Sequence, residues 1–575
     1  MVHDEEGLIT TVVDGNMTDM ATDVAPDMLT DLATDAVTGE ETRTMGDMRL
    51  DKNVTIPMRD SLELRADVFR AESQKRAPVI LTMGPYGKDI HFQDFNAAAF
   101  ASVEERGPHM NWETVNPEWW VPRGFVVIRV DQRGTGQSPG RMELQAPQEY
   151  DDLFDVIEWA ADQPWSSGKV ALMGISYYAM NQWHVAAMRP PGLAAIVPWE
   201  GASDLYREWW YHGGILSNGF TDAWWPRQIL GNQHGLGDAD PTVTLPGNVD
   251  LPAQMREHPL YDEFYEERAA RLHDIEVPLL SAGNWGGFAL HLRGNVEGFL
   301  EAGSAQKWLE VHAGNHFAPF YSTDSRAYQQ RFLDHFLKGA DNGWDEEPPV
   351  KLFIRDSTGG RFRHELEWPL ARTQWRRLHL DVAAGTLTSE QPAPARADYP
   401  ALTGGIDLVT PPMTQDLEIT GPLKLSVWME ATAQDLDVFV TVNNIDPDGT
   451  VLTFEDASGM LGPVVKGWQR ASHRELDVEL SKPYRPVLTH RKRDLLEPGT
   501  PVRLEVEISP TSMVFEKGHR LGLSIRAYDV GEKTRFWHDD PQDRSPDLFE
   551  GTNSVLSGGE HDSYLLIPVI PGTLA

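Results

Sequence analysis

The chain contains no cysteine among its 575 residues, so disulfides, thiolate metal ligands and cysteine nucleophiles are all excluded. It also lacks a basic excess: 50 Lys and Arg stand against 87 Asp and Glu, giving a formal net charge of −37. This charge makes nucleic acid and anionic membrane surfaces poor partners. No apolar run is long enough to span a bilayer, and residues 1–17 carry acids where a signal peptide would carry Lys or Arg. We therefore expect a cytoplasmic protein with neither membrane nor nucleic-acid partners.

The N-terminal stretch differs in texture from the rest of the chain. Residues 1–40 hold many acids, no Lys or Arg, and recurrent Thr-Asp pairs. Such a composition predicts an acidic, disordered tail, which we place at residues 1–47. From residue 48 onwards, Leu50–Ile56 and Leu62–Phe69 alternate in hydrophobicity around a short polar turn, which predicts an antiparallel hairpin.

Short apolar runs of strand length then alternate with helical patterns. The runs are Val79–Met83, Phe125–Val130, Val170–Met173, Ala194–Val197, Val277–Leu280 and Trp308–Val311. Between the second and third runs, apolar residues recur at helical spacing from Tyr150 to Ala160. Strands alternating with helices predict an α/β fold with a mostly parallel sheet covered on both faces. We assign residues 48–204 and 273–340 to this unit.

Two further regions lie outside that pattern. The gap between the fourth and fifth runs is too long for one crossover and holds paired tryptophans and short helical pieces, so we predict an inserted helical cap over residues 205–272. After Gly339 the chain turns to short alternating strands separated by Gly, Pro and Asp. This texture predicts an all-β jelly roll or sandwich over residues 341–575.

A serine stands where a strand gives way to a helix. Gly174-Ile175-Ser176-Tyr177 follows the third run, which is the setting of a nucleophile elbow. The full G-x-S-x-G pattern is absent because Tyr178 occupies the second glycine position. Taken alone, the motif is equally compatible with an ordinary serine at a helix N-cap.

The ends of neighbouring strands strengthen the catalytic interpretation. Met83–Gly87 leaves an early strand at the edge where an oxyanion donor belongs, and residues 131–138 form a charged, glycine-rich turn. That turn lacks the lysine and spacing of a phosphate loop, so we expect it to brace the site, with Asp131 and Arg133 pairing internally. His312 and His316 follow the last strand, where the base of a Ser…acid…His order must lie.

These motifs fall in the order of a known family. Tyr86, D-x-R-G-x-G-x-S at 131–138, G-x-S-Y at 174–177, the segment 203–207 and the segment 332–339 together resemble the cocaine-esterase-like family of α/β-hydrolases. This family includes X-Pro dipeptidyl-peptidases and α-amino acid ester hydrolases. The resemblance extends over about residues 48–570, through segments 435–437, 446–449 and 515–521. It implies a hydrolase domain, a helical cap and a C-terminal jelly roll.

The resemblance also implies roles for individual residues. Ser176 resembles the nucleophile, the Tyr177 amide and the Tyr86 side chain resemble the oxyanion donors, and His316 matches the base. His312 is the competing base, but it lies nearer the strand and suits a structural part. Ala179 replaces a family glycine, a change of one methyl group that we expect the fold to tolerate.

A larger departure concerns the triad acid. Gly286 stands where the family places its aspartate. Without an acid, the imidazolium formed during attack loses its partner, and the rate falls by several powers of ten. We favour Glu200, directly after the fourth apolar run, as the replacement. Asp204 or Glu297 reaching into the site, or a catalytically slow or silent relative, are the alternatives.

The sequence thus predicts a serine hydrolase that cleaves acyl ester or amide bonds of a small, neutral, partly apolar substrate, with no metal or cofactor. The tryptophans that we expect to wall its pocket are Trp119, Trp209, Trp210, Trp224 and Trp225. An X-Pro dipeptidyl-peptidase, an α-amino acid ester hydrolase and a catalytically silent ligand-binding relative remain alternatives. A homo-oligomer stays open, since no residue pattern specifies an oligomeric state.

Overall fold

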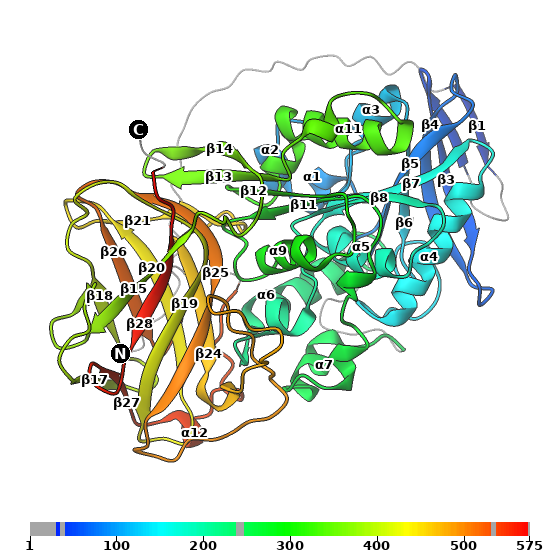
Figure 1. Cartoon of the computed structure of the whole chain (residues 1–575). Helices are drawn as coiled ribbons and strands as arrows, with labels where there is room; N and C mark the ends of the chain where they lie inside the picture. Colours follow the sequence, from blue (N-terminus) through cyan, green and yellow to red (C-terminus); the bar gives the residue numbers. More distant parts are fainter. Residues whose placement is uncertain (1–29, 35–40, 237–246, 531–535, 573–575) are drawn as a thin grey trace, which may run out of the picture.

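The computed structural model describes residues 30–34, 41–236, 247–530 and 536–572. A long, mixed sheet forms the centre of the N-terminal half (Figure 1). Its strands are β2 (Glu41–Met45), β3 (Met48–Pro57), β4 (Glu63–Ala71), β5 (Ala77–Gly84), β6 (Val126–Asp131), β7 (Ser166–Ile175), β8 (Leu193–Trp199), β11 (Leu279–Asn284), β12 (Lys307–His312), β13 (Val350–Asp356) and β14 (Gly359–Glu365). Each of the six apolar runs that we predicted as strands overlaps a strand of this sheet, although Val277 and Pro278 precede β11 and Phe125 precedes β6.

Pairing of the strands gives the order β2-β3-β4-β6-β5-β7-β8-β11-β12-β13-β14. The strands from β6 to β13 are parallel, and antiparallel pairs extend both ends. Parallel strands require crossover connections, and here most of these are helical. The arrangement is that of an α/β-hydrolase sheet, in which side chains that follow the carboxyl ends of β5, β7, β8, β11 and β12 meet at one edge.

Alternate residues of each central strand enter different cores. Along β7, Ala171 and Met173 belong to one buried cluster, whereas Val170 and Leu172 belong to another. Successive side chains of a strand point to opposite faces, so both faces of the sheet are covered. Helix α11 (Thr323–Lys338) covers the first face, and α4 (Pro147–Asp162) packs on the second, with α5 (Tyr177–Ala187) contacting both clusters. Figure 1 shows α11 on one side of the sheet, with α4 and α5 on the other.

The segment predicted as a cap lies between β8 and β11 and consists of short elements. They are the π-helical turns Tyr206–Trp210 and Trp225–Ile229, the strands β9 (Tyr211–His212) and β10 (Ile215–Leu216), the helices α6 (Asn218–Trp224), α7 (Leu251–Glu257) and α8 (Glu263–Glu266), and the 3-10 turns Leu230–Asn232 and Leu272–Asp274. Other short helices near the sheet are α1 (Phe92–Phe95), α2 (Ala97–Ser102), α3 (Pro117–Trp120), α9 (Leu292–Glu301) and α10 (Ala318–Tyr321).

The C-terminal region is rich in sheet and has its own core. Its strands are β15 (Gln374–Asp381), β16 (Thr386–Thr388), β17 (Ala395–Pro400), β18 (Gly405–Val409), β19 (Leu417–Ala431), β20 (Asp437–Ile445), β21 (Val451–Leu452), β22 (Phe454–Glu455), β23 (Leu461–Gly462), β24 (Val465–Arg470), β25 (Val502–Phe515), β26 (Arg520–Arg526), β27 (Thr552–Ser557) and β28 (Tyr564–Val569). The short helix α12 (Pro546–Phe549) and the 3-10 turn Ala471–His473 lie between them. Most pairs are antiparallel, and their inward side chains form one apolar cluster. We call residues 366–572 the C-terminal β domain.

One of the expected boundaries requires correction, and the other lies within a continuous set of paired strands, since β13 pairs with both β12 and β25. Residues 41–45 form β2, which pairs with β3, and β1 (Thr30–Thr34) pairs with β2, so these residues are not a disordered tail; residues 1–29 and 35–40 lie outside the described residues. Strands β13 and β14 extend the central sheet, although we assigned residues after 341 to the β domain. A local pattern identifies a strand, but it does not reveal which sheet the strand joins.

No helix in the described ranges is both long and apolar enough to cross a membrane.

Candidate active site

Ser176 occupies a strained turn between β7 and α5. Its backbone has φ 58° and ψ −114°, a region that non-glycine residues rarely adopt, and its amide donates to the carbonyl oxygens of Trp199 and Glu200 at 3.0 and 3.1 Å. Such a conformation costs about 1–3 kcal/mol, and it persists because the surrounding hydrogen bonds hold it. The geometry is that of a nucleophile elbow, which presents the serine hydroxyl at the carboxyl edge of the sheet.

Glycines make room for the side chains that depart from the family pattern. A Cβ on Gly84 would lie 2.6 Å from Cε1 of Tyr178, so the glycine at the end of β5 accommodates this ring. A Cβ on Gly201 would lie 2.6 Å from Cβ of Ala179. The extra methyl of Ala179 is therefore tolerated, as expected, because its neighbour across the contact is a glycine.

His316 and Glu200 form a close pair beside the nucleophile. Nδ1 of His316 lies 2.7 Å from Oε2 of Glu200, which follows β8 and is fully buried. His312 contacts the other oxygen of the same carboxylate, with its Nε2 2.9 Å from Oε1. Asn284, the last residue of β11, donates to Oε1 as well, at 3.2 Å. One carboxylate thus joins the ends of three adjacent strands.

Charge pairing dominates the ionisation of this cluster. Burial alone would raise the pKa of Glu200, but the positive charges of His316 and His312 lower it to about 2. Burial alone would lower the pKa of His316, but the carboxylates of Glu200 and Glu113 raise it to about 10. The pair is therefore ionised near neutral pH, with a proton held on His316.

Glu113 is a second carboxylate at His316 and was not anticipated from the sequence. Its Oε1 lies 3.4 Å from Nε2 of His316, and its side chain is 4 % exposed. Burial, opposed by the charge of His316, raises the pKa of Glu113. Glu113 therefore contacts Nε2 of His316, the ring nitrogen that a general base would direct to the nucleophile.

Ser176 itself is hydrogen-bonded to another histidine. Within the described part of the chain, the side-chain partner of its Oγ is Nε2 of His291, at 3.1 Å. The His291 ring lies nearly parallel to that of His316, with centroids 5.5 Å apart and an interplanar angle of 13°. The structure thus brings Ser176, His316 and Glu200 into one site, while His316 faces Glu113 rather than bonding directly to Ser176.

Backbone packing explains why the acid does not stand at position 286. A Cβ on Gly286 would lie 2.6 Å from Cα of Asp456 and 2.9 Å from the Ala457 nitrogen, both in the C-terminal β domain. The Ala457 amide donates to the Gly286 carbonyl at 3.3 Å, and the Ala457 carbonyl accepts from the His316 amide at 3.0 Å. The segment that fixes the His316 loop therefore fills the space that an aspartate would need.

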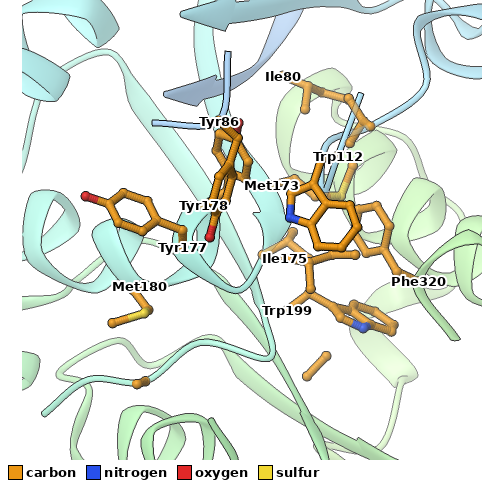
Figure 2. Close-up of a cluster of buried hydrophobic side chains, with 14 of the residues drawn as sticks. Ile80, Tyr86, Trp112, Met173, Ile175, Tyr177, Tyr178, Met180, Trp199 and Phe320 are labelled. Carbon is orange, nitrogen blue, oxygen red and sulfur yellow. The ribbon is translucent and has the colours of Figure 1, made fainter. Parts of the chain in front are cut away.

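Tyr86 and Tyr177, the expected oxyanion donors, lie close together, and Tyr86 lines the cavity at Ser176. Their ring centroids are 6.0 Å apart, and Figure 2 shows them next to Tyr178. The Tyr86 hydroxyl accepts from Nε1 of Trp224 at 3.0 Å, which leaves its own hydrogen available for another acceptor. Tyr177 is the first residue of α5, so its amide has no acceptor within the helix.

The glycine-rich turn after β6 braces the loop that carries Tyr86, although by different contacts from those expected. Asp131 accepts from the amides of Lys88 and Gln137, at 2.7 and 2.9 Å. Arg133 pairs with Asp152 and Asp60, not with Asp131. The expectation of an internal Asp131–Arg133 pair was wrong because the buried Asp131 instead satisfies backbone donors of the adjoining loops.

A cavity of about 380 Å³ opens at these residues. Its polar lining includes Ser176, Glu113, His291, His316, Asn315 and Glu455, and its aromatic lining is Tyr86, Trp112, Phe220, Trp224, Phe317 and Phe536. Both halves of the protein contribute, since Glu455 and Phe536 belong to the C-terminal β domain. This volume suits a small organic group.

Of the five tryptophans expected in the pocket, only Trp224 lines it. Trp119 packs between the guanidinium groups of Arg123 and Arg326, 3.3 and 4.0 Å from its ring centroid. Trp209, Trp210 and Trp225 are buried in the apolar core. Because a cap core and a pocket wall use the same aromatic residues, composition did not separate the two.

Sequence reasoning missed His291, Glu113 and Asn284. His291 precedes α9, and Glu113 lies in the long connection between β5 and β6, so neither is marked by a strand end. Asn284 does end a strand, and that position was a signal we could have used. The described residues contain no group of three or more His, Asp or Glu side chains placed to hold a metal ion.

Comparison with known proteins agrees with this geometry. Residues 60–318 match the model of the X-Pro dipeptidyl-peptidase (S15) family, and residues 342–566 match that of the X-Pro dipeptidyl-peptidase C-terminal non-catalytic domain. The chain is 23 % identical to cocaine esterase of Rhodococcus sp., covering 91 % of this chain and 99 % of the relative. It is 24 % identical to a putative serine esterase of Mycobacterium bovis, covering 83 % of this chain and 90 % of the relative.

The solved structures include a close match. The crystal structure of a CocE/NonD family hydrolase from Staphylococcus aureus has a TM-score of 0.85 and 30 % identity, covering 92 % of this chain and 94 % of that one. Together with the strand order and the two family matches, this shows an α/β-hydrolase fold with a sheet-rich C-terminal domain. The chain belongs to the family of cocaine esterase and the X-Pro dipeptidyl-peptidases, and it is a serine hydrolase that acts on ester or amide bonds.

Proposed function

We propose that this hydrolase cleaves the acyl ester or amide bond of a small, neutral, partly apolar substrate through an acyl-enzyme on Ser176. The observation that carries the proposal is the 2.7 Å contact between His316 and Glu200 at the rim of the cavity that holds Ser176. A histidine oriented by a buried carboxylate is the base that a serine nucleophile needs. Glu200 thereby completes a catalytic triad in place of an acid at 286.

In the proposed reaction, Oγ of Ser176 attacks the carbonyl carbon while His316 takes the hydroxyl proton. The carbonyl electron pair moves to oxygen, and the Tyr86 hydroxyl and the Tyr177 amide donate to this oxyanion. The bond to the leaving alcohol or amine breaks as His316 returns the proton to it. Water then adds to the acyl-enzyme by the same steps and releases the acid.

The reaction requires the protonated His316 to pass its Nε2 proton to the Glu113 carboxylate, 3.4 Å away, before Nε2 can take a proton from Ser176. Substrate entry favours this change at His316, because an acyl group that fills the cavity excludes water. In the lower dielectric, a neutral imidazole and a neutral carboxylic acid are favoured over the ion pair. In the absence of substrate, catalytic hydrogen bonds are often long or poorly aligned, and they tighten only in the substrate complex. The aromatic lining of the cavity supports an apolar portion on the substrate.

A second candidate substrate carries a free amine next to the acyl group, as in X-Pro peptides and α-amino acid esters. Glu113 and Glu455 line the cavity, and a carboxylate there would attract an ammonium group. The sequence left this class open as an alternative to a neutral substrate. The cavity supplies carboxylates from other loops, so a panel of nitrophenyl esters, aminoacyl esters and X-Pro amides should separate the two classes.

Covalent labelling tests the proposal directly. A fluorophosphonate probe should modify the wild-type protein at Ser176, as located by peptide mass spectrometry, and should not modify Ser176→Ala. Hydrolysis of a nitrophenyl ester should fall in parallel. Binding of substrate without labelling or turnover would instead support a catalytically silent ligand-binding relative.

Three finer assignments are also proposals. The antiparallel strands and single core of the C-terminal β domain support a jelly roll. The absence of cysteine supports a cytoplasmic location. A homo-oligomer stays a proposal whose test is a measurement of mass in solution.

A further inference from the structure

His291 touches the proposed nucleophile, yet the mechanism above gives it no role. The residue lies just before α9, is 3 % exposed, and places its Nε2 3.1 Å from Oγ of Ser176. Its amide donates to the Gly287 carbonyl at 3.0 Å, and its carbonyl accepts from the Asn295 amide at 3.1 Å. The backbone that carries the imidazole is therefore held at both of its polar groups.

The hydrogen bonds of the ring show which nitrogen carries hydrogen. The Ala202 amide donates to Nδ1 of His291 at 3.2 Å, so Nδ1 presents a lone pair. Burial, with the positive charge of the adjacent His316, lowers the pKa of His291 to about 3 and keeps the ring neutral. A neutral imidazole has one N–H, which must then be on Nε2 and must point to Ser176.

This tautomer excludes His291 as the general base. Its Nε2 has no lone pair to accept the serine proton. Moving the hydrogen to Nδ1 would place it against the N–H of Ala202, so that two donors would face each other. His316 lines the same cavity as Ser176 and has the Glu200 carboxylate at its Nδ1, so the two histidines differ in chemistry although their rings stack.

We propose that His291 is a further catalytic residue: a fixed hydrogen-bond donor to Oγ of Ser176 that assists breakdown of the acyl-enzyme. The inference rests on the proposed acyl-enzyme mechanism and deepens it. A serine hydroxyl oxygen already accepts a good hydrogen bond in the free enzyme, whereas an ester oxygen is a weak acceptor. The bond from Nε2 therefore strengthens most as the ester oxygen becomes a leaving alkoxide.

The assisted step balances without any further reactant. Water has added to the acyl carbon, and His316 holds the proton taken from that water. As the tetrahedral intermediate collapses, the carbon–Oγ bond breaks and its electron pair goes to Oγ. His316 then gives its proton to Oγ, while His291 donates its hydrogen bond throughout and transfers no proton.

Two substitutions of His291 test the donor Nε2 and the acceptor Nδ1 separately. In His291→Asn the amide oxygen can replace Nδ1 as acceptor for Ala202, but no donor reaches Ser176. In His291→Gln the longer amide can replace Nε2 as donor. Stopped-flow hydrolysis of p-nitrophenyl butyrate gives acylation from the burst and deacylation from the steady state. We expect deacylation to fall about 10- to 100-fold in His291→Asn, with a much smaller change in acylation and a nearly stoichiometric burst.

His291→Gln should retain most of the deacylation rate, and if His291→Asn does not fold, His291→Phe supplies the donor-free ring. Thermal unfolding and stoichiometric phosphonate labelling of Ser176 show that each variant is intact. Equal losses in acylation and deacylation, or no difference between the Asn and Gln variants, would overturn the role of His291. Failure of the phosphonate to label Ser176 in the wild-type protein would instead refute the acyl-enzyme proposal itself.

Discussion

At the scale of single residues, the site concentrates backbone strain. Glu113, Ser176 and Glu200 all have left-handed φ values, of 61°, 58° and 51°. Each costs about 1–3 kcal/mol, so the fold must hold them by other contacts. The Glu200 amide donates to the Ala282 carbonyl at 2.6 Å, and its carbonyl accepts from Ser176. The strained turn after β8 thereby directs one carboxylate to both His312 and His316.

Replacing this carboxylate with an amide tests its role. Glu200→Gln preserves the size of the side chain but removes the charge that holds a proton on His316 and that stabilises the imidazolium during attack. We expect kcat on a nitrophenyl ester to fall on the order of 10⁴-fold, as for loss of a triad acid elsewhere. Circular dichroism should show that the fold persists.

Glu310 provides a matched control, because it contacts His312, the histidine that Glu200 also contacts. Glu310 pairs with Lys351 at 2.9 Å and faces His312 rather than His316. Glu310→Gln removes an equally buried carboxylate, and kcat should change far less than in Glu200→Gln. Comparable losses in both variants would mean that the effect is structural and that Glu200 is not the triad acid.

The Glu113 carboxylate should set the pH dependence of the base. His316 acts as a base only when it is deprotonated, and its pKa is raised to about 10 by Glu200 together with Glu113, despite burial. Glu113→Gln removes one of these negative charges, so the pKa of His316 should fall. We expect the ascending limb of kcat/KM against pH to move to lower pH.

Parallel measurements with an uncharged and an ammonium-bearing ester sharpen that test. If Glu113 also binds the ammonium group, the variant should lose activity on the charged ester while it gains activity on the neutral ester near pH 7. An unchanged pH profile on both substrates would show that Glu113 does not control His316.

At the scale of elements, strand ends located much of the site. Ser176, Glu200 and His316 each follow a strand of a parallel sheet, and such ends meet at one edge whatever the details of packing. Their proximity could therefore be predicted from the order of strands and helices. The roles of these residues stay predictions until tested.

Loops could not be placed in the same way. His291 and Glu113 reach the cavity through segments whose course depends on long-range packing, not on a local repeat. The tryptophans failed for another reason: burying an indole in the cap or against a ligand satisfies the same hydrophobic requirement. Strand patterns likewise could not assign β13 and β14 to the central sheet.

The contact between α5 and the turn after β8 is a testable feature at this scale. Gly201→Ala would place a methyl 2.6 Å from Cβ of Ala179 and should destabilise the protein by about 1–3 kcal/mol. Adding Ala179→Gly should recover part of that loss, because it removes one of the two methyls. Denaturant unfolding of the single and double variants gives the coupling, and purely additive effects would contradict the contact.

At the scale of the whole molecule, the C-terminal β domain is part of the active site. The cavity is lined by Glu455, Ala457, Ser458, Gly459 and Phe536 of this domain, and the Ala457 carbonyl accepts from the His316 amide. The two halves therefore cannot be altered independently. The backbone of Asp456 and Ala457 gives a physical reason for the relocated triad acid, since it lies against the position of the missing aspartate.

Restoring that aspartate should consequently fail. In a Glu200→Gln background, Gly286→Asp places a carboxyl at the family position, but its Cβ would lie 2.6 Å from Cα of Asp456. We expect no recovery of turnover, together with a loss of stability of about 1–3 kcal/mol from the displaced segment. Gly462→Ala is the control, on the β22–β23 hairpin whose loop contains Asp456 and Ala457. The nearest neighbour of its added Cβ would lie 3.9 Å away, so this substitution should be tolerated. Recovery of esterase activity in the Glu200→Gln, Gly286→Asp variant would show that position 286 can still hold the acid, and that packing by the C-terminal β domain does not explain its move to Glu200.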